Sequence, residues 1–259
     1  MGQRLREMIG GIPYRLALAG GWIDQPFVSR LAEGGGSMVT ARVEPTFPFM
    51  ERAGIATGTR KVMRQRWGDV VPDRPTGELV REIYDAENDG KAAPSGSQDM
   101  IGLLTAGVCR LDYDVGHGGG VFPKHVEVCR DAEVIDWLER HLHLLPVGPR
   151  PAGYDPLVED RVTAELATRL GRSGRDCFEA IVGRDLAALG RSMNGCSACW
   201  AEMLPGVMRH PTLTVDLPAL LAAYQEDHPG AMFSGCGGGY LIVASETPPP
   251  GTFGVTLSR

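Results

Sequence analysis

The sequence predicts an α+β protein built in two halves that divide near residue 120. Short apolar strand patterns at residues 12–20 and 240–244 each adjoin a glycine-rich loop, which is typical of strands that end at a turn. Between them, the segments 78–88 and 131–143 carry apolar residues three and four positions apart, which is the spacing of amphipathic helices. Strands and helices therefore alternate along one chain.

Chain length, composition and charge narrow the function classes. At 259 residues the chain is long enough for one large domain or two small ones, with 43% hydrophobic residues to form a core. The net charge of −6 argues against nucleic-acid binding, which needs a clustered basic face, but a local basic pocket can still bind an anionic substrate. No apolar run approaches the ~20 residues that cross a bilayer, and Met1–Arg6 leads into no signal peptide. We expect a cytoplasmic protein without a membrane or nucleic-acid partner.

Six cysteines are spread along the chain, and Cys196 and Cys199 form a lone CxxC pair. A zinc site of the usual spacing needs a second pair, which the sequence lacks. Free cysteine is also among the residue types most often buried. We therefore expect buried thiols at these positions.

The first apolar strand carries the first candidate site residues. Arg15 lies near its start, and Gly20-Gly21 ends it. Asp24 follows in a loop, and we place its carboxylate in a pocket; capping of the turn in that loop is the alternative. Further along, a glycine triplet at 34–36 marks a turn, and Met38–Val43 is expected to be a strand.

Residues 54–68 combine a loop of small residues with a basic helix that ends at Gly68. Backbone amides at the start of such a helix can bind phosphate, aided by hydroxyl and basic side chains. The side chains nearby are Thr57, Thr59, Arg60 and Lys61. The alternative is a capped surface helix with a solvated basic face.

The helix predicted at 78–88 has Glu87 at its end. The helix dipole disfavours a carboxylate at the C-terminal end of a helix, which indicates a role for this residue. A surface acid without a specific role is the alternative.

The stretch Pro94–Leu103 joins a turn of small residues to an acid and to an apolar helical pattern at 99–106. Small residues leave the amides at the helix start open, and the partial positive charge there favours a carboxylate or a phosphate. Asp99 is therefore a candidate site residue. An ordinary N-cap by Ser95 or Ser97 is the alternative.

The rest of the chain continues the alternation. We expect strands at 107–113, 144–147, 240–244 and 253–257, and helices at 131–143, at 158–204 with breaks near 171–174 and 190–191, and at 217–224. His117 lies in a glycine loop, where a solvated side chain is favoured over a substrate contact. Met193, Cys196 and Trp200 fall at helical spacing and are expected in the core.

A second glycine-rich loop spans residues 235–239. The dinucleotide-binding fingerprint follows a strand and opens a helix, whereas here a strand follows the loop, so that interpretation fails. Glycines do permit a backbone to approach a ligand closely. A tight hairpin turn is the alternative.

Three of these stretches together resemble the GHMP small-molecule kinases, nearest the branch of heptose-7-phosphate kinases and fucokinase-like sugar kinases. They are Pro13–Pro26 with its Arg, apolar strand and Gly-Gly-x-x-Asp-x-Pro, the Gln98-Asp99 pair, and the loop 235–239 before a strand. The resemblance implies a two-lobed α+β fold with a shortened N-terminal half. Each lobe, 1–120 and 121–259, would be a mainly antiparallel sheet packed with helices, with the site in the cleft between them.

The resemblance also implies ATP-dependent phosphoryl transfer to a hydroxyl of a sugar, sugar phosphate or cyclitol, with ATP and Mg²⁺ as cofactors. Asp99 would orient the acceptor hydroxyl and take its proton, with Arg15 beside it. The substrate contacts would be Gly21, Asp24, Gln98 and Arg150. The nucleotide contacts would be Thr57, Gly58, Thr59, Ser97, Gly235, Gly237, Gly238 and Gly239. Glu87 with Thr57 or Thr59 would bind Mg²⁺. We expect a sugar or sugar-phosphate partner and leave a homodimer open.

The segment 54–60 departs from the family's phosphate loop. Ala56 stands where that loop has its second glycine, and Arg60 stands where it has a small residue. A second interpretation is therefore a non-catalytic sugar-binding or regulatory protein of the same fold, and a third is a phosphate-releasing or isomerising enzyme. An amide nest that faces Asp99 would favour the kinase, and an Arg60 side chain that fills this space would favour the binder.

Overall fold

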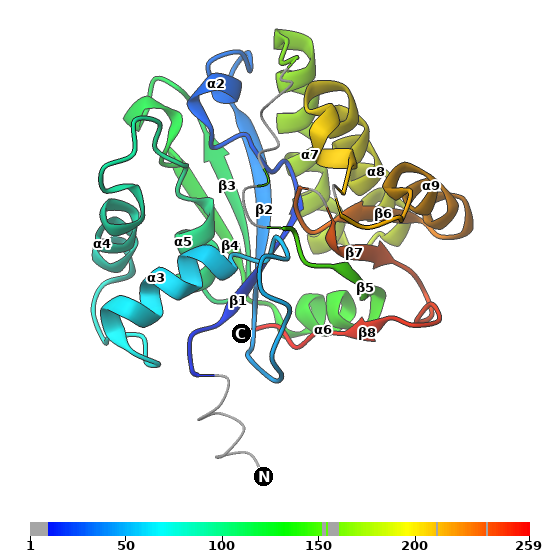
Figure 1. Ribbon diagram of the computed structural model, residues 1–259, viewed down its shortest axis with the longest axis horizontal. Helices are drawn as coiled ribbons and strands as arrows, with labels where there is room; N and C mark the ends of the chain where they lie inside the picture. Colours follow the sequence, from blue (N-terminus) through cyan, green and yellow to red (C-terminus); the bar gives the residue numbers. More distant parts are fainter. Residues whose placement is uncertain (1–9, 152–153, 155–160, 211, 237) are drawn as a thin grey trace.

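The computed structural model describes residues 10–151, 154, 161–210, 212–236 and 238–259. In this part of the chain, two antiparallel sheets of four strands are packed with helices, as the sequence predicted (Figure 1). The first sheet has the order β1-β2-β3-β4 and the second the order β6-β7-β5-β8. All of the strand pairs are antiparallel.

The bounds of the elements are as follows. The strands are β1 (Tyr14–Ala19), β2 (Gly36–Val43), β3 (Val108–Tyr113), β4 (His125–Cys129), β5 (Leu142–Gly148), β6 (Gly230–Phe233), β7 (Gly239–Ala244) and β8 (Phe253–Gly254). The α-helices are α2 (Pro26–Ser29), α3 (Thr57–Trp67), α4 (Thr76–Asn88), α5 (Gln98–Leu104), α6 (Ala132–His141), α7 (Ala164–Gly183), α8 (Leu186–Met203) and α9 (Leu217–Asp227). Two short 3₁₀ helices are η1 (Gly118–Gly120) and η2 (Pro205–Met208).

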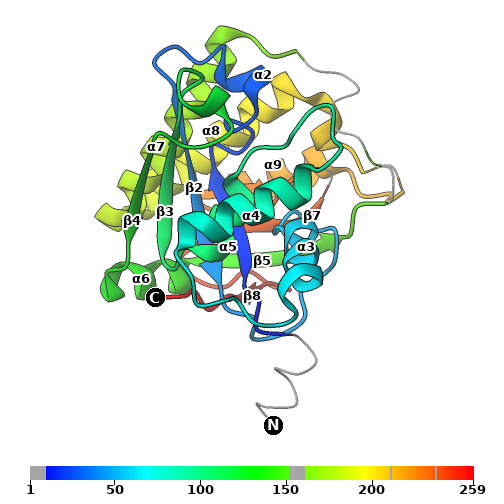
Figure 2. The ribbon, with the colours of Figure 1, turned by 90° about the vertical axis from the view of Figure 1, so that its left-hand side faces the viewer.

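Helices cover both faces of the first sheet. Figures 1 and 2 show α3, α4 and α5 on one side, and α7 packs along β2 on the other. Every residue of β1 is therefore buried, including the charged Arg15. The sheet extends through β4 to Cys129, which lies past residue 120, where we expected the two halves to divide.

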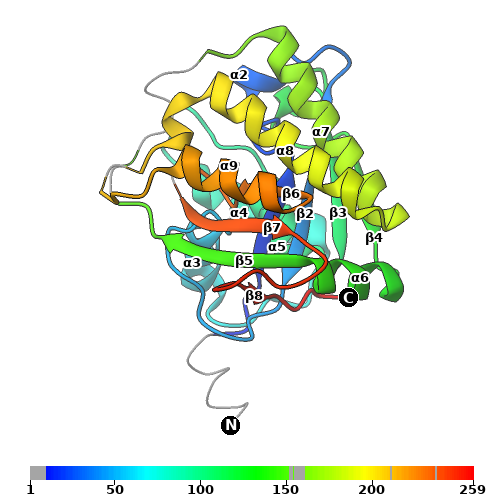
Figure 3. The same cartoon turned by 90° about the vertical axis from the view of Figure 1, so that its right-hand side faces the viewer.

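The second sheet lies beside the first and is covered by α8 and α9 (Figure 3). Helix α8 contacts β1 of the first sheet as well as β6 and β7 of the second. Five aromatic rings also join the two sheets through contacts between ring centroids of 4.2 to 6.2 Å. They belong to Tyr14, Phe47, Phe49, Tyr240 and Phe253. The two halves thus share one continuous core.

The C-terminal segment returns to the first sheet. We predicted a strand at 253–257, but β8 ends at Gly254. Leu257 instead forms an isolated bridge with Val43 of β2, and the Ser258 amide donates to the Arg42 carbonyl at 2.9 Å. After β8 the chain therefore joins the first sheet at the end of β2. Strands β4 and β6 were not predicted.

The predicted breaks in the long helical region were wrong. We expected them near Gly171–Gly174 and Gly190–Arg191, whereas α7 and α8 run through both segments and the chain turns at Arg184. The glycines serve close packing instead of a turn. A Cβ at Gly174 would lie 1.9 Å from the Ser37 carbonyl oxygen of β2.

The expected core residues are confirmed. Met193, Cys196 and Trp200 are buried in α8, and Cys199 is a buried free thiol. Among the described residues, no group of three or more His, Cys, Asp or Glu side chains is placed to hold a metal ion. None of the helices described is long and apolar enough to cross a membrane.

Replacing Gly174 with alanine should destabilise the fold, because the new methyl group would meet backbone atoms of β2 that cannot move aside. Overpacking of this kind costs about 1–3 kcal/mol. Gly183→Ala in the same helix is the control, since a Cβ there meets nothing within 4 Å and should stabilise the helix slightly. The urea midpoints of the two variants measure the difference, and equal midpoints would contradict this account of the packing.

Candidate functional site

A cavity of about 270 Å³ brings together residues from both halves of the chain. From the first half it is lined by Arg15, Ala17, Gly21, Trp22, Gly54, Ala56, Thr57, Gly58, Thr59, Glu87, Gln98 and Asp99. From the second half it is lined by Arg150, Trp200, Ser234, Gly235 and Cys236. Ten of the site residues predicted from sequence therefore line one cavity.

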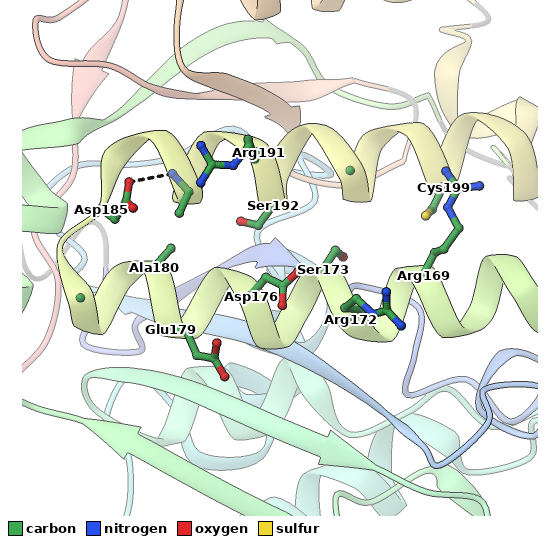
Figure 4. Close-up of a pocket in the computed structure, with 13 residues that line it drawn as sticks. Arg169, Arg172, Ser173, Asp176, Glu179, Ala180, Asp185, Arg191, Ser192 and Cys199 are labelled. Atoms are coloured by element: carbon green, nitrogen blue, oxygen red, sulfur yellow. Dashed lines mark hydrogen bonds between the residues drawn. The ribbon is translucent and has the colours of Figure 1, made fainter.

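A larger hollow of about 760 Å³ lies between α7 and α8. Its charged lining residues, shown in Figure 4, are Arg169, Arg172, Arg191, Asp176, Glu179 and Asp185. These charges cancel, and the hydroxyls of Ser173 and Ser192 donate to carbonyls of their own helices. Since none of the sequence-predicted site residues lines this hollow, we place the candidate site in the smaller cavity.

The centre of the cavity is an ion pair between Arg15 of β1 and Asp99 in the first turn of α5. Arg15 is only 5% exposed, and its Nε has no hydrogen-bond partner among the described residues. Gly102 makes room for the arginine, because a Cβ at that position would lie 2.3 Å from the Arg15 Cγ. A buried charge of this kind is stable only beside a partner, so the pair fixes where α5 lies.

Beside this pair, one hydroxyl lies between two carboxylates. Thr59 Oγ1 lies 2.6 Å from Glu87 Oε2, to which it donates, and 3.4 Å from Asp99 Oδ2. Burial, together with the nearby charge of Asp99, raises the pKa of Glu87. Two carboxylates and a hydroxyl are hard oxygen ligands of the kind that Mg²⁺ prefers, and Mg²⁺ needs only one or two carboxylates when phosphates complete its shell. The residues present therefore fit this ion.

The start of α3 opens onto the same cavity. Ala56 precedes the helix in a left-handed conformation (φ 61°), and no side chain caps the first turn. A Cβ at Gly58 would meet nothing within 4 Å, so the space beside the first amides is open. The Thr57 hydroxyl accepts a hydrogen bond from the Arg52 amide at 3.0 Å, which makes Thr59 the threonine that lies beside the carboxylates.

The Arg60 side chain leaves this space open. Its Nε donates to the Ile12 carbonyl at 2.9 Å, and its guanidinium lies over the Tyr14 ring, 4.3 Å from the centroid. Arg60 does not line the cavity. Of the two arrangements that we distinguished from the sequence, the one in which Arg60 fills this space is therefore wrong.

Asp24 lies behind the cavity wall. It is fully buried, accepts from Gln98 Nε2 at 2.9 Å, and does not line the cavity, whereas Gln98 does. Gly96 permits this approach, because a Cβ there would lie 2.1 Å from Asp24 Oδ2. The Gln98 Oε1 is buried without a partner among the described residues. The structure thus places Gln98 at the cavity and Asp24 as the group that orients it.

Burial of Asp24 also changes its proton affinity. Desolvation, followed by the charge of Asp99, raises the pKa of Asp24 to about 7, while the Gln98 amide and Arg15 oppose the shift. The carboxylate that we expected to contact substrate therefore titrates near neutral pH inside the protein.

The second glycine loop meets the first. Gly235 lines the cavity, and a Cβ at Gly235 would lie 2.9 Å from the Gly54 Cα. Gly238 and Gly239 lie away from the cavity, and Gly239 packs on the Ala53 carbonyl. Gly237 lies outside the described residues.

Ser97, Gly21 and Arg150 have different surroundings. Ser97 is buried, and its hydroxyl shares a hydrogen bond of 3.3 Å with Tyr113 instead of lining the cavity. The Gly21 carbonyl accepts from Trp200 Nε1 at 3.0 Å. Arg150 lines the cavity, and its Nε donates to the Arg52 carbonyl at 3.1 Å.

Seven cavity-lining residues were not among the predicted site residues: Ala17, Trp22, Gly54, Ala56, Trp200, Ser234 and Cys236. Trp22 was detectable, because it follows the glycine pair in the loop that carries Asp24. Trp200 was expected in the core, which is correct, but the helical spacing that predicted its burial cannot show that its ring also reaches a cavity.

Comparison with known proteins identifies the fold. No protein-family model matches the chain, and no curated protein sequence matches it significantly. Among solved structures, a mevalonate kinase matches with a TM-score of 0.58 at 10% identity, covering 96% of this chain and 99% of that chain. Lactococcus lactis galactokinase complexed with galactose matches with a TM-score of 0.59 at 11% identity, covering 99% of this chain and 97% of that chain. A D-glycero-D-manno-heptose 1-phosphate kinase from Bacteriodes thetaiotaomicron matches with a TM-score of 0.53 at 12% identity, covering 95% of this chain and 95% of that chain. The chain therefore has the GHMP-kinase fold, as its sequence motifs predicted.

The stability of the protein should depend on pH through Asp24. A raised pKa means that the folded state binds a proton that the unfolded state has already lost, so stability falls as pH rises from about 4 to about 7 and is level above that. At 1.36 kcal/mol per pKa unit, the loss is on the order of 4 kcal/mol. Urea denaturation at several pH values should show this decline in the parent and not in Asp24→Asn. Asp73→Asn, at an exposed position, should keep the parent's profile; the same profile in all three proteins would contradict the prediction.

Proposed function

We propose that the protein is an ATP-dependent kinase that transfers a phosphoryl group to a hydroxyl of a sugar, sugar phosphate or cyclitol. The observation that supports this most is the meeting of the Arg15–Asp99 pair, the open start of α3 and Gly235 in one cavity. The three matched structures described above are a mevalonate kinase, a galactokinase and a D-glycero-D-manno-heptose 1-phosphate kinase.

A protein catalyses phosphoryl transfer mainly by positioning the reactants and by offsetting their negative charge. Asp99 lines the cavity, with Oδ1 paired to Arg15 and Oδ2 at 3.4 Å from the Thr59 hydroxyl. In the proposed reaction, Asp99 orients that hydroxyl and takes its proton as the oxygen bonds to phosphorus. Arg15 would hold Asp99 in place and contribute a buried positive charge beside it.

Backbone amides would bind the phosphates. Those at the start of α3 are uncapped, and the helix end carries partial positive charge. Gly58 leaves room for phosphate oxygens, and Gly235 brings a second backbone segment to the same space. Because the amides do the binding, Ala56 in place of a glycine is compatible with this role, since it already adopts the left-handed conformation.

Glu87 and Thr59 would hold Mg²⁺, with Asp99 close by. When bound, this ion offsets the negative charge of the phosphates and of the clustered carboxylates. On the acceptor side, the amide group of Gln98, which lines the cavity, would bind a substrate hydroxyl. Arg150 would bind an anionic group on a sugar phosphate.

The first test is calorimetric titration of Mg·ATP into the parent and into Asp99→Asn. Both should bind, because Asp99 acts on the acceptor and its amide analogue keeps the same shape. A screen of sugars, sugar phosphates and cyclitols for ADP release should then find an acceptor with the parent. Asp99→Asn should lower kcat for that acceptor by about 10²–10⁴, which is the usual contribution of a positioned general base.

Asp85→Asn, a change of the same chemistry at an exposed position of α4, should retain the parent's rate. If the parent does not bind Mg·ATP at millimolar nucleotide, the kinase proposal is wrong. Binding of a sugar without nucleotide would then support the non-catalytic binder.

Replacing Glu87 with glutamine should raise the Mg²⁺ concentration needed for half-maximal activity by roughly tenfold or more, because a neutral amide is a weaker ligand for a hard cation. The effect should appear in a Mg²⁺ titration at fixed ATP. Glu78→Gln, in the exposed first turn of the same helix, is the control. An unchanged Mg²⁺ requirement in Glu87→Gln would remove Glu87 from the metal site.

A further inference from the structure

Trp22 has a backbone conformation that is rare for a large side chain. Four non-glycine residues have positive φ in the described part of the chain: Trp22 (83°), Arg52 (58°), Ala56 (61°) and Arg184 (57°). Trp22 is the one aromatic residue among them. A bulky residue in this region of φ is a genuine outlier, and such strain persists where the surrounding structure enforces it, often at functional sites.

The loop around Trp22 shows how this conformation is enforced. The Ile23 amide donates to the Gly20 carbonyl at 3.2 Å, and the Gln25 amide donates to the Trp22 carbonyl at 3.0 Å. These successive turns leave little freedom at Trp22. A glycine would satisfy them without strain, as Gly20 does in the same loop with φ of 78°. The turn therefore does not explain the presence of an indole.

The position of the indole offers an explanation. The ring lies edge-on to Phe27, with centroids 6.2 Å apart, so one aromatic neighbour supports it. The side chain is half-buried and lines the same cavity as Asp99 and Gln98. An aromatic wall with a few polar groups opposite is the usual construction of a small-molecule site.

We propose that Trp22 is a specificity-determining residue that binds the acceptor of the proposed kinase reaction through the flat face of its indole. The acceptor class is then a single six-membered polyol ring, a pyranose or a cyclitol. Such a ring has C–H groups that pack on the electron-rich aromatic face and hydroxyls on its rim for polar partners. The inference rests on the proposed function for the reaction, and it adds the ring shape of the acceptor and the residue that selects it.

Two further features fit this acceptor. The cavity volume of about 270 Å³ is small for a ligand site, which favours one ring over an oligosaccharide. Gln98, whose side chain the buried Asp24 orients, lines the same cavity and supplies an amide group for one hydroxyl on the rim. An open-chain polyol could still reach Gln98 but would gain little from a flat wall.

The test compares the parent with Trp22→Gly and Trp22→Phe, using hexopyranoses and inositols as cyclic probes and the matching open-chain alditols as acyclic ones. Glycine accepts the backbone conformation at this position, so Trp22→Gly should fold. Its KM for the cyclic acceptor should rise about tenfold or more, with a smaller change in kcat and an unchanged Kd for Mg·ATP. Trp22→Phe should be intermediate, and activity on alditols should be affected little.

A second readout does not need turnover. Cyclic acceptors should change the tryptophan fluorescence of the parent and of Trp67→Phe, and this response should be clearly smaller in Trp22→Phe, where Trp200 is the tryptophan that still lines the cavity. Trp67 lies at the end of α3, where it donates to Glu82, and serves as the matched control.

The outcomes separate this inference from the proposed function. If the parent phosphorylates a cyclic acceptor and the Trp22 variants keep its KM, the inference is wrong while the kinase proposal stands. If the parent does not bind Mg·ATP, the kinase proposal fails and the fluorescence readout decides. A response to cyclic polyols that depends on Trp22 then supports a binding role for this residue, and no such response overturns it.

Discussion

A buried positive charge organises the candidate site. Arg15 lies on a strand whose residues are all buried, and removing a guanidinium from water is costly unless an anion accompanies it. Asp99 meets that need from the start of α5, and Gly102 lets the helix come close enough. The arginine is thus held by the core, while its partner faces a cavity. This arrangement places a carboxylate where a ligand can reach it without leaving it free to move.

Around this pair the site contains more acid than base. Asp24, Glu87 and Asp99 lie within one network, and the pKa values of Asp24 and Glu87 are raised by burial and by the charge of Asp99. Such a cluster attracts cations and repels bare phosphate. Anionic ligands would therefore enter most readily together with a divalent ion. The backbone amides at the start of α3 carry partial positive charge and would also attract an anion.

Much of the fold could be predicted from sequence, because apolar spacing reports which face of a strand or helix is buried. The Arg15, Asp99 and Gly235 stretches were also recognisable as parts of one site. The sequence around a glycine could not show whether that glycine forms a turn, contacts a ligand or allows close packing. Gly171–Gly174 and Gly190 were predicted as helix breaks, but they allow neighbouring backbones to pack closely. Gly96 leaves room for the Asp24 carboxylate, which is buried behind Gln98. For the same reason Ser97 and Gly239, plausible as ligand contacts, proved to pack against the protein itself.

The return of residues 256–258 to the first sheet bears on how the chain folds. Ser258 pairs with Arg42 at the end of β2, so this part of a sheet that begins near the N-terminus is completed only after the second half has been synthesised. Contacts of such large sequence separation slow folding, because the intervening chain must be ordered first. The first half would emerge from the ribosome with part of its sheet still unpaired. The cavity depends on the second half as well, because Arg150, Trp200 and Ser234–Cys236 form part of its lining.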